Sequence, residues 1–236
     1  MAVVTQRVTP IVALDVAGAA AALALVDELG PLCRFYKIGS ELFTAEGPSI
    51  VRSVQSFGAS VFLDLKFHDI PNTVRGAVRS AAALGARLVT VHASGGGAML
   101  EAALAGAREV AGDCDVLAVT VLTSLDAAGL SVAWGRPVRD LHAEVLRLAG
   151  DARAAGLAGV VCSGQEAAAV RERHGNALAT LVPGVRLAGG PGHDQARVVT
   201  PREAAKAGAR YIVVGRAVTA APSPAQAMEA VLADLP

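Results

Sequence analysis

The 236-residue sequence is poor in aromatic side chains (3%) and in charged ones (18%), and neither sign of charge is in excess. Its 21 basic residues equal its 21 acidic residues, which argues against electrostatic binding to nucleic acid or to an anionic membrane. No run reaches the roughly 18 uninterrupted apolar residues of a membrane-spanning helix. Residues 1–10, MAVVTQRVTP, lack the charged start, apolar centre and cleavage site of a signal peptide. We therefore expect neither a nucleic-acid partner nor a membrane partner.

Cysteine is also scarce, because only Cys33, Cys114 and Cys162 are present, far apart and without a CxxC motif. An odd number of widely spaced cysteines argues against a disulfide framework. Reduced thiols and the absence of a signal peptide predict a cytoplasmic protein. The five histidines show neither HxH nor HExxH spacing, so we expect no metal site.

Hydrophobic residues make up 53% of the chain, which is enough for a large core and excludes a disordered protein. Short apolar runs alternate with alanine-rich stretches from end to end. The apolar runs predict strands over residues 11–16, 34–39, 60–67, 88–93, 115–122, 159–163, 180–185 and 211–218. The stretches between them predict helices over residues 18–29, 47–57, 71–84, 97–111, 138–155, 165–173, 201–207 and 223–234.

The expected strands are almost continuously apolar, as buried parallel strands are. Eight such strands, each followed by a helix, predict an α/β protein with a (β/α)8 TIM barrel as a single domain over residues 1–236. An open doubly wound sheet usually has fewer strands and a glycine-rich first turn, whereas the first strand here continues as LDVAGAA. Two long connections, 123–137 and 186–197, are expected as loops at the C-terminal face of the barrel.

Polar side chains occur at the C-terminal ends of the expected strands, where the active site of a barrel lies. Asp64 and Lys66 are two residues apart, so a regular strand would present both on one side. Two ionised groups in so apolar a strand are costly unless they are paired. In chain order, the polar set is Asp15, Lys37, Asp64, Lys66, Asp69, His92, Thr123, Ser124, Arg186 and Arg216, with Gly215 beside the last.

An Asp-x-Lys pair in an apolar strand has two interpretations. It could be a salt bridge that closes the top layer of the barrel, or it could belong to a catalytic charge array. Asp15 and Lys37 on neighbouring strand ends favour the second interpretation, because alternating Lys and Asp side chains make a preorganised field that stabilises developing charge.

The segment DLKFHDIPNTV (64–74) contains Asp64-x-Lys66-x-x-Asp69 followed by Ile-Pro-Asn-Thr, and it closely resembles the signature of the orotidine 5′-phosphate decarboxylase family. Further motifs of this family occur in the right order along the eight consecutive expected strands. They are LDV on strand one, YKIG on strand two, VLTS on strand five, PGVR on strand seven, DQ in the next loop and VVGR on strand eight.

This resemblance implies decarboxylation of orotidine 5′-phosphate to uridine 5′-phosphate, the last step of pyrimidine nucleotide synthesis, without a metal or an organic cofactor. It implies that Lys66 donates a proton to C6 of the pyrimidine and that Asp64 lies beside the substrate carboxylate. It also implies a homodimer with shared active sites, in which Asp69 and Thr73 reach the site of the other subunit. Lys37, Asp64, Lys66 and Asp69 would then form the charged array.

The same resemblance implies the contacts with the rest of the nucleotide. Asp15 and Lys37 would contact the ribose, and Thr123 and Ser124 would contact the pyrimidine. The phosphate would be held by Arg186, Gln195 and Arg216, together with the backbone at Gly215.

Two alternatives stay open at this point. Related barrels, the hexulose-phosphate synthase and ketogulonate-phosphate decarboxylase group, share the Asp-x-Lys-x-x-Asp strand but use Mg²⁺, which is bound by a Glu where this chain has Lys37. A lysine at that position would repel the cation. The other alternative is a phosphate-binding barrel without catalytic activity, which would need no intact array of Lys and Asp.

Overall fold

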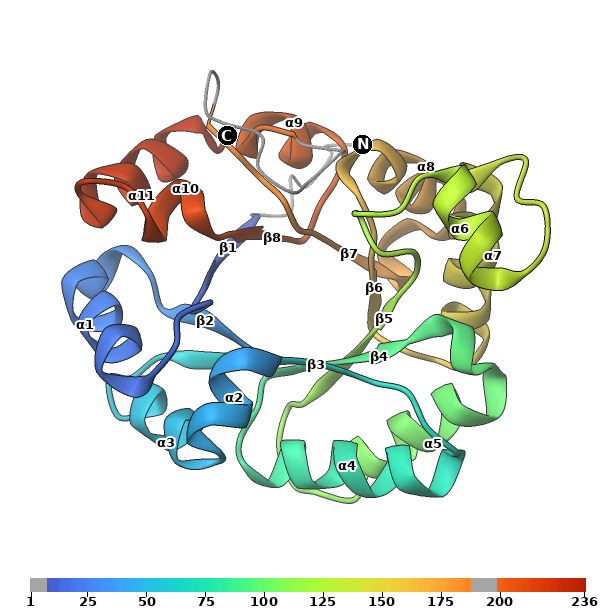
Figure 1. The fold of residues 1–236 in the computed structure, drawn as a ribbon, viewed down its shortest axis with the longest axis horizontal. Coiled ribbons are helices and arrows are strands. Elements are labelled where there is room, and N and C mark those ends of the chain that lie inside the picture. The colour runs from blue at the N-terminus through green and yellow to red at the C-terminus, as the bar shows by residue number, and fades with distance from the viewer. Residues whose placement is uncertain (1–7, 188–198) are drawn as a thin grey trace.

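The computed structural model describes residues 8–187 and 199–236. Within these residues, eight parallel strands form a closed barrel in which each strand pairs with its neighbours in chain order, and β8 closes on β1 (Figure 1). The expected (β/α)8 barrel is therefore confirmed. The strands are β1 (Thr9–Ala13), β2 (Phe35–Gly39), β3 (Ser60–Phe67), β4 (Leu88–His92), β5 (Asp115–Val119), β6 (Gly159–Val161), β7 (Ala179–Val182) and β8 (Tyr211–Val214).

Helices surround the barrel as an outer ring (Figure 1). None of them, in the part of the chain that the structure describes, is long and apolar enough to cross a membrane. The α-helices are α1 (Ala19–Leu29), α2 (Ser40–Glu46), α3 (Ser49–Gln55), α4 (Pro71–Ala83), α5 (Gly97–Arg108), α6 (Ala127–Trp134), α7 (Leu141–Ala154), α8 (Gly164–His174), α9 (Pro201–Lys206), α10 (Arg216–Thr219) and α11 (Pro224–Asp234). Short 3-10 turns lie at Gly30–Leu32, Ala93–Gly95 and Gly175–Ala177.

Several of the expected boundaries are wrong. The strands expected over 115–122 and 180–185 end at Val119 and Val182, and the helix expected over 138–155 begins at Leu141. The helix expected over 47–57 is α3, which starts only at Ser49 after Pro48, and a further helix, α2, ends before it at Glu46 and is capped by Gly47 with φ 63°. The strand expected over 211–218 ends at Val214, and α10 begins at Arg216. The first strand lies at Thr9–Ala13 instead of 11–16, because Thr9 and Pro10 pair with β8.

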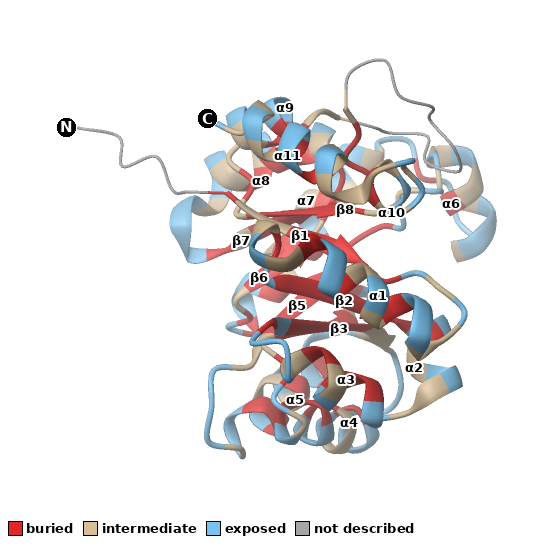
Figure 2. Cartoon of the chain, turned by 90° about the vertical axis from the view of Figure 1, so that its left-hand side faces the viewer, coloured by how far each residue is buried: buried red, intermediate tan, exposed pale blue. Residues whose placement is uncertain are grey.

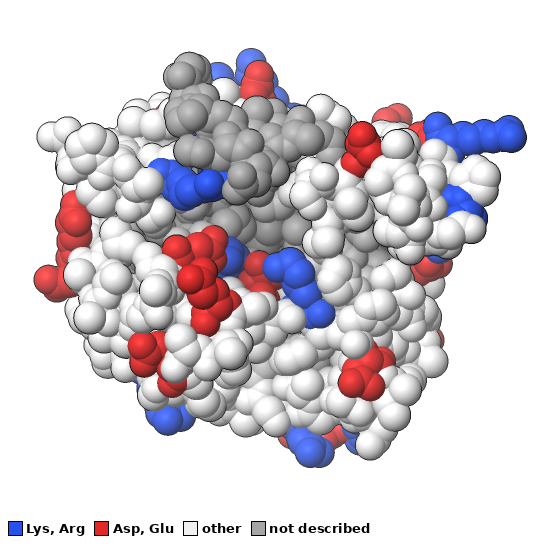
Figure 3. Space-filling view, in the orientation of Figure 1, with Lys and Arg blue, Asp and Glu red and all other residues white. Residues whose placement is uncertain are grey.

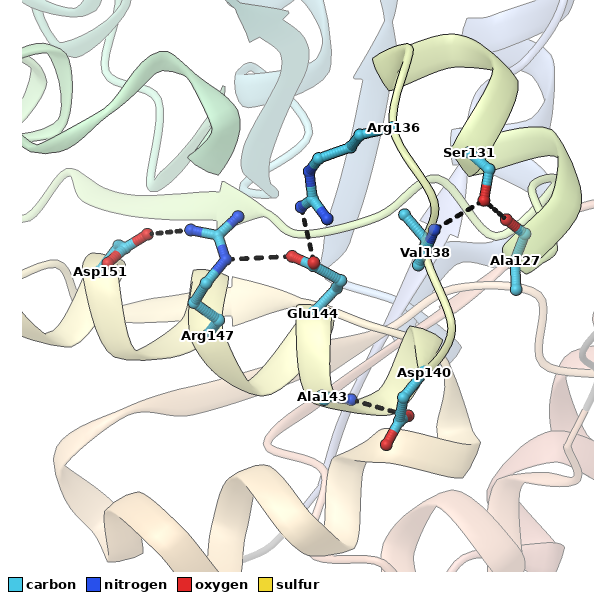
Figure 4. Close-up of polar contacts among 9 residues, drawn as sticks. All are labelled: Ala127, Ser131, Arg136, Val138, Asp140, Ala143, Glu144, Arg147 and Asp151. Carbon is cyan, nitrogen blue, oxygen red and sulfur yellow. Dashed lines mark hydrogen bonds and ion pairs between the residues drawn. The ribbon is translucent and has the colours of Figure 1, made fainter.

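The connection expected as a loop over 123–137 contains α6 and leads into α7, and polar contacts hold it in place (Figure 4). Asp126 accepts a hydrogen bond from the Gly129 N–H at 2.7 Å and so caps α6. The Val138 N–H donates to Ser131 Oγ at 2.8 Å. Arg136 pairs with Glu144 of α7 at 2.6 Å. The segment between α6 and α7 is therefore joined to both helices by polar contacts.

The apolar side chains form two separate layers, inside the barrel and between the barrel and the helices. Figure 2 shows the strands buried at the centre and the outer faces of the helices exposed. The interior layer is made by side chains from several strands: Ile11, Ala13, Phe35, Phe62, Leu88, Leu117, Leu181, Tyr211 and Val213. Bulky side chains of this kind fill a small barrel completely, so it is a packed core and leaves space only at its ends.

The alternation of side chains along the strands places charge above this interior layer. On β2, Phe35 faces the interior, so Lys37 and Gly39 point the same way. On β3, Phe62 faces the interior and Asp64 follows it on the same side. The register pairs Lys37 with Phe62 and Gly39 with Asp64. On each of these two strands, the inward-facing residue two positions after the apolar one is therefore charged and lies at the mouth of the barrel.

Candidate active site

A cavity of about 470 Å³ opens at the C-terminal end of the strands. Acidic and basic side chains meet at the hollow in the middle of this face, where the surrounding surface is mostly uncharged (Figure 3). Apolar residues from the interior layer, including Ala13, Phe62 and Val213, form its floor. Eight of the residues singled out in the sequence line it, namely Asp15, Lys37, Asp64, Lys66, Thr123, Arg186, Gly215 and Arg216.

Four of these side chains form a chain of alternating charge. The Lys37 ammonium lies 2.7 Å from Asp15 Oδ1 and 3.7 Å from Asp64 Oδ2. The Lys66 ammonium lies 2.8 Å from the same Asp64 Oδ2. Lys37 and Asp64 are buried, whereas the side chain of Lys66 is 36% exposed towards the cavity. The two lysines thus share one carboxylate oxygen. Lys66 and Asp15, whose side chain is 56% exposed, are the members of the array that a bound molecule can reach.

The environment of Asp64 keeps its carboxylate ionised. Burial raises the pKa of this group, but the ammonium groups of Lys66 and Lys37 and a hydrogen bond from Thr90 lower it by more. The pKa of Asp64 therefore lies below its ordinary value of 3.8. At neutral pH the Asp64 carboxylate is therefore negatively charged and lies between the two lysines.

Lys66 has an unusual backbone conformation. Its φ is +50°, the only positive φ of a residue other than glycine within residues 8–187 and 199–236. It lies where the pairing of β3 with β4 shifts register between Leu63 and Phe67. Such an irregularity changes the direction in which a side chain points. The expected same-side arrangement of Asp64 and Lys66 therefore holds for the charged groups, although the strand between them is not regular.

Thr90 also belongs to the site, although it was not predicted from the sequence. Its hydroxyl contacts both the Asp64 carboxylate and the Lys66 backbone from within β4. Threonine is a common residue in strands, so its place in LVTVH gave no signal beyond one polar residue in an apolar run.

Because Gly39 has no side chain, the Lys37–Asp15 ion pair has room beside it. A Cβ atom at this position would lie 3.0 Å from Lys37 Nζ and 3.2 Å from Asp15 Oδ1. Even alanine would therefore crowd the ion pair.

Two arginines reach the opposite side of the cavity, after β7 and β8. The Arg186 backbone N–H donates to the Val199 carbonyl at 3.0 Å, and its side chain is buried. Arg216 begins α10 directly after Gly215. The loops after strands seven and eight are the usual phosphate site of such barrels, and guanidinium groups match a phosphate well.

Three of the expected residues, Asp69, Thr73 and Ser124, do not line this cavity. Asp69 and Thr73 are exposed on the segment that leads from β3 into α4, and Asp69 Oδ1 accepts a hydrogen bond from the Ile70 N–H. Ser124 is also exposed, next to Thr123. Gln195 lies outside the described residues. In the described part of the chain no three His, Cys, Asp or Glu side chains are grouped as metal ligands.

Comparisons with known proteins give one consistent result. Residues 9–231 match the model of the family described as "Orotidine 5'-phosphate decarboxylase / HUMPS family". The orotidine 5′-phosphate decarboxylase of Moorella thermoacetica is 50% identical over 230 residues, covering 95% of this chain and 91% of its own length. That of Halorhodospira halophila is 52% identical over 227 residues, covering 95% and 94%. The solved structure of the Lactobacillus acidophilus enzyme of the same name superposes with a TM-score of 0.85 at 36% identity, covering 97% and 98%.

Proposed function

The chain belongs to the orotidine 5′-phosphate decarboxylase / HUMPS family, and on this premise we propose that it converts orotidine 5′-phosphate to uridine 5′-phosphate and CO2 in pyrimidine nucleotide synthesis. The observation that supports this function most directly is the array of Lys37, Asp64 and Lys66, which lines the cavity above its apolar floor. Relatives of about half-identical sequence that carry this enzyme name support it as well.

The proposed chemistry needs charge and a proton, and the array provides both. Loss of CO2 from C6 leaves an electron pair in the plane of the pyrimidine ring, where no carbonyl group is placed to delocalise it. Without a cofactor as electron sink, fixed charges must stabilise this carbanion. The Lys66 ammonium stabilises the carbanion by its charge and then transfers its proton to C6, so that a C–H bond replaces the broken C–C bond.

Asp64 contributes in two ways. Its carboxylate holds the Lys66 ammonium at 2.8 Å and thereby fixes the position of the proton. It also repels the carboxylate of the substrate, and this repulsion disappears as CO2 forms. Two like charges about 4 Å apart interact by about 4 kcal/mol at an effective dielectric constant near 20. We assign this repulsion a supporting role beside that of Lys66.

The remaining residues bind the parts of the nucleotide that do not react. Arg186 and Arg216, with Gln195 and the backbone of Gly215, bind the phosphate. Asp15 and Lys37 bind the ribose, while Thr123 and Ser124 bind the pyrimidine. Binding energy from the phosphate then holds the ring against the charged array, which is how a remote group raises the rate of a reaction at another position.

We also propose a homodimer in which Asp69 and Thr73 complete the active site of the partner. Both are exposed and outside the cavity of their own chain, and the neighbouring Ile70 is a large apolar residue that is 67% exposed. The test mixes inactive Lys66→Ala chains with inactive Asp69→Ala chains under conditions of subunit exchange. Recovery of activity supports shared sites, and no recovery after exchange has been demonstrated refutes them.

The magnesium-dependent alternative fits the geometry less well. The Lys37 ammonium lies between the carboxylates of Asp15 and Asp64, at 2.7 and 3.7 Å, where it would repel a divalent cation. For the same reason we propose that the reaction needs no metal ion.

The decisive experiment is an absorbance assay with orotidine 5′-phosphate and protein treated with EDTA, with Lys66→Ala as the matched inactive control. Turnover by the treated protein is the expected result. Turnover of ketogulonate phosphate only after addition of Mg²⁺ would favour the related sugar-phosphate enzymes, and no turnover of either substrate would favour a binding protein.

We also propose a cytoplasmic location, which agrees with the three cysteines, all of which are thiols.

A further inference from the structure

Thr90 is fully buried at the centre of β4, and its hydroxyl has two defined partners. It lies 3.0 Å from the Lys66 backbone nitrogen and 2.9 Å from Asp64 Oδ1. A backbone N–H can only donate, so the Thr90 oxygen must accept the bond from Lys66. The hydroxyl proton is then left for Asp64, which accepts it as a carboxylate. The direction of both hydrogen bonds is thereby fixed.

The position of Thr90 opposite the irregular part of β3 explains why these bonds matter. Leu63 pairs with Val89 and Phe67 pairs with Val91, so four steps along β3 match two steps along β4. Thr90 is the β4 residue within this stretch, and Lys66 within it has a φ of +50°. The Lys66 N–H therefore bonds to a side chain of the neighbouring strand, in place of the carbonyl group that a regular ladder supplies.

The bond to Asp64 determines which carboxylate oxygen faces the lysines. Oδ1 accepts the hydrogen bond from Thr90, and Oδ2 accepts both ion pairs, with Lys66 at 2.8 Å and Lys37 at 3.7 Å. Without the hydroxyl, rotation about the Asp64 Cβ–Cγ bond would no longer be restrained from the β4 side. The Lys66 ammonium would then lose a fixed partner.

Building on the proposed decarboxylation, we propose that Thr90 is a positioning residue. Its hydroxyl holds the Lys66 backbone in the left-handed conformation and the Asp64 carboxylate in the orientation that aims the Lys66 ammonium into the cavity. Thr90 acts through these two residues and does not itself line the described cavity. Residues that orient the groups at a reacting centre commonly affect rates by 10- to 100-fold, as they do around metal ligands.

A second buried threonine provides the matched control. Thr180 in β7 is 2% exposed, and its hydroxyl donates to the Gly208 carbonyl at 3.5 Å, near the opposite end of the barrel. Thr180→Val removes a buried hydroxyl without touching the charged array. Loss of stability through a missing hydrogen bond is common to both threonines, whereas loss of positioning is specific to Thr90.

The experiment compares Thr90→Val, Thr90→Ser and Thr180→Val by steady-state kinetics with orotidine 5′-phosphate. We expect Thr90→Val to lower kcat by about 10- to 100-fold with a change in KM of less than about threefold, since a misplaced reacting group slows the chemical step. Thr90→Ser keeps both hydrogen bonds and should restore most of kcat, and Thr180→Val should keep the kcat of the unmodified protein. A normal kcat in folded Thr90→Val, or equal losses in the Ser and Val variants, would overturn the proposal. If Thr90→Val does not fold, Thr90→Ala replaces it with the same expectations.

A titration that needs no substrate separates this proposal from the proposed reaction. The pKa of Asp64, read by carbon-13 NMR of its carboxyl group, should rise in Thr90→Val, because a hydrogen bond to the charged form is lost. The charged and titratable groups around Asp64 are Lys66 on its own strand, Lys37 on β2 and His92 on β4, and none of these is altered. An Asp64 pKa that stays unchanged refutes the role of Thr90 even if the protein turns over another substrate. A raised pKa in a protein that does not decarboxylate orotidine 5′-phosphate refutes the proposed function alone.

Discussion

Replacement of Gly39 by alanine should reduce activity while it stabilises the fold. Gly39 has φ −89° and ψ −178°, a conformation that alanine adopts without strain. The new methyl group would lie 3.0 Å from Lys37 Nζ and 3.2 Å from Asp15 Oδ1, and ordinary contact begins near 3.4 Å. Both atoms are at the free ends of side chains, so they yield more readily than backbone would.

The magnitude follows from these distances. The Lys37 ammonium must withdraw by about 0.4 Å, the difference between 3.4 and 3.0 Å. A displacement of 1 Å in an active site costs about 100-fold in rate, so in proportion we expect about a sixfold fall in kcat/KM, or about 1 kcal/mol of activation free energy. Alanine in place of glycine lowers the entropy of the unfolded chain and should add about 0.4–1 kcal/mol to the free energy of unfolding.

The measurements are kcat/KM for orotidine 5′-phosphate and the midpoint of thermal unfolding, with Gly150→Ala as control. A Cβ atom at Gly150, within α7, meets no atom within 4 Å. The control should gain stability through helix propensity, by up to about 1 kcal/mol, and keep normal activity. Unchanged activity in a folded Gly39→Ala variant would refute the claim that the placement of the Lys37 ammonium limits turnover.

Three further predictions concern the charged array and the packing of the helices. Lys66→Ala should lower kcat by several orders of magnitude with a normal circular-dichroism spectrum, and a nearly normal rate would contradict its role as proton donor. The pKa of Asp64 is depressed in the folded protein, so its stabilising contribution is complete above the ordinary value of 3.8 and is lost as the pH falls through the folded value. In urea unfolding, the free energy of unfolding of the unmodified protein should therefore exceed that of Asp64→Asn by a constant amount above about pH 5 and by less in more acidic solution. A difference that grew as the pH fell would contradict this prediction. Gly106→Ala should lower the free energy of unfolding by about 1–3 kcal/mol with little change in kcat, because its Cβ would lie 2.2 Å from the Arg75 carbonyl oxygen where α5 packs on α4.

The barrel could be predicted from the sequence because its strands are buried on both faces. Continuous apolar runs such as that over 60–67 mark such strands, and the alternation within them places Lys37 and Asp64 on the inward side. The ends of the strands were harder to place. β1 begins at Thr9 because that residue pairs with Tyr211 of β8, and such pairing is a property of two distant segments.

The sequence also contains local signals for α6, which was not predicted. Asp126 before α6 and Gly135 after it, with φ 62°, are ordinary start and stop residues of a helix within the connection expected as a loop. In the site, the charged residues could be predicted because charge is rare in this chain. Thr90 could not, since its role depends on a register shift between β3 and β4 that no local pattern indicates.

The left-handed backbone at Lys66 sets a limit on how this protein can be improved. A residue with a Cβ atom pays of order 1 kcal/mol or more for that conformation, whereas glycine adopts it freely. Directed evolution for heat resistance alone would thus favour Gly at the position of the proposed proton donor. Mutant libraries made to raise the thermal stability of this protein should keep Lys66 unchanged and vary residues on the outer helices instead.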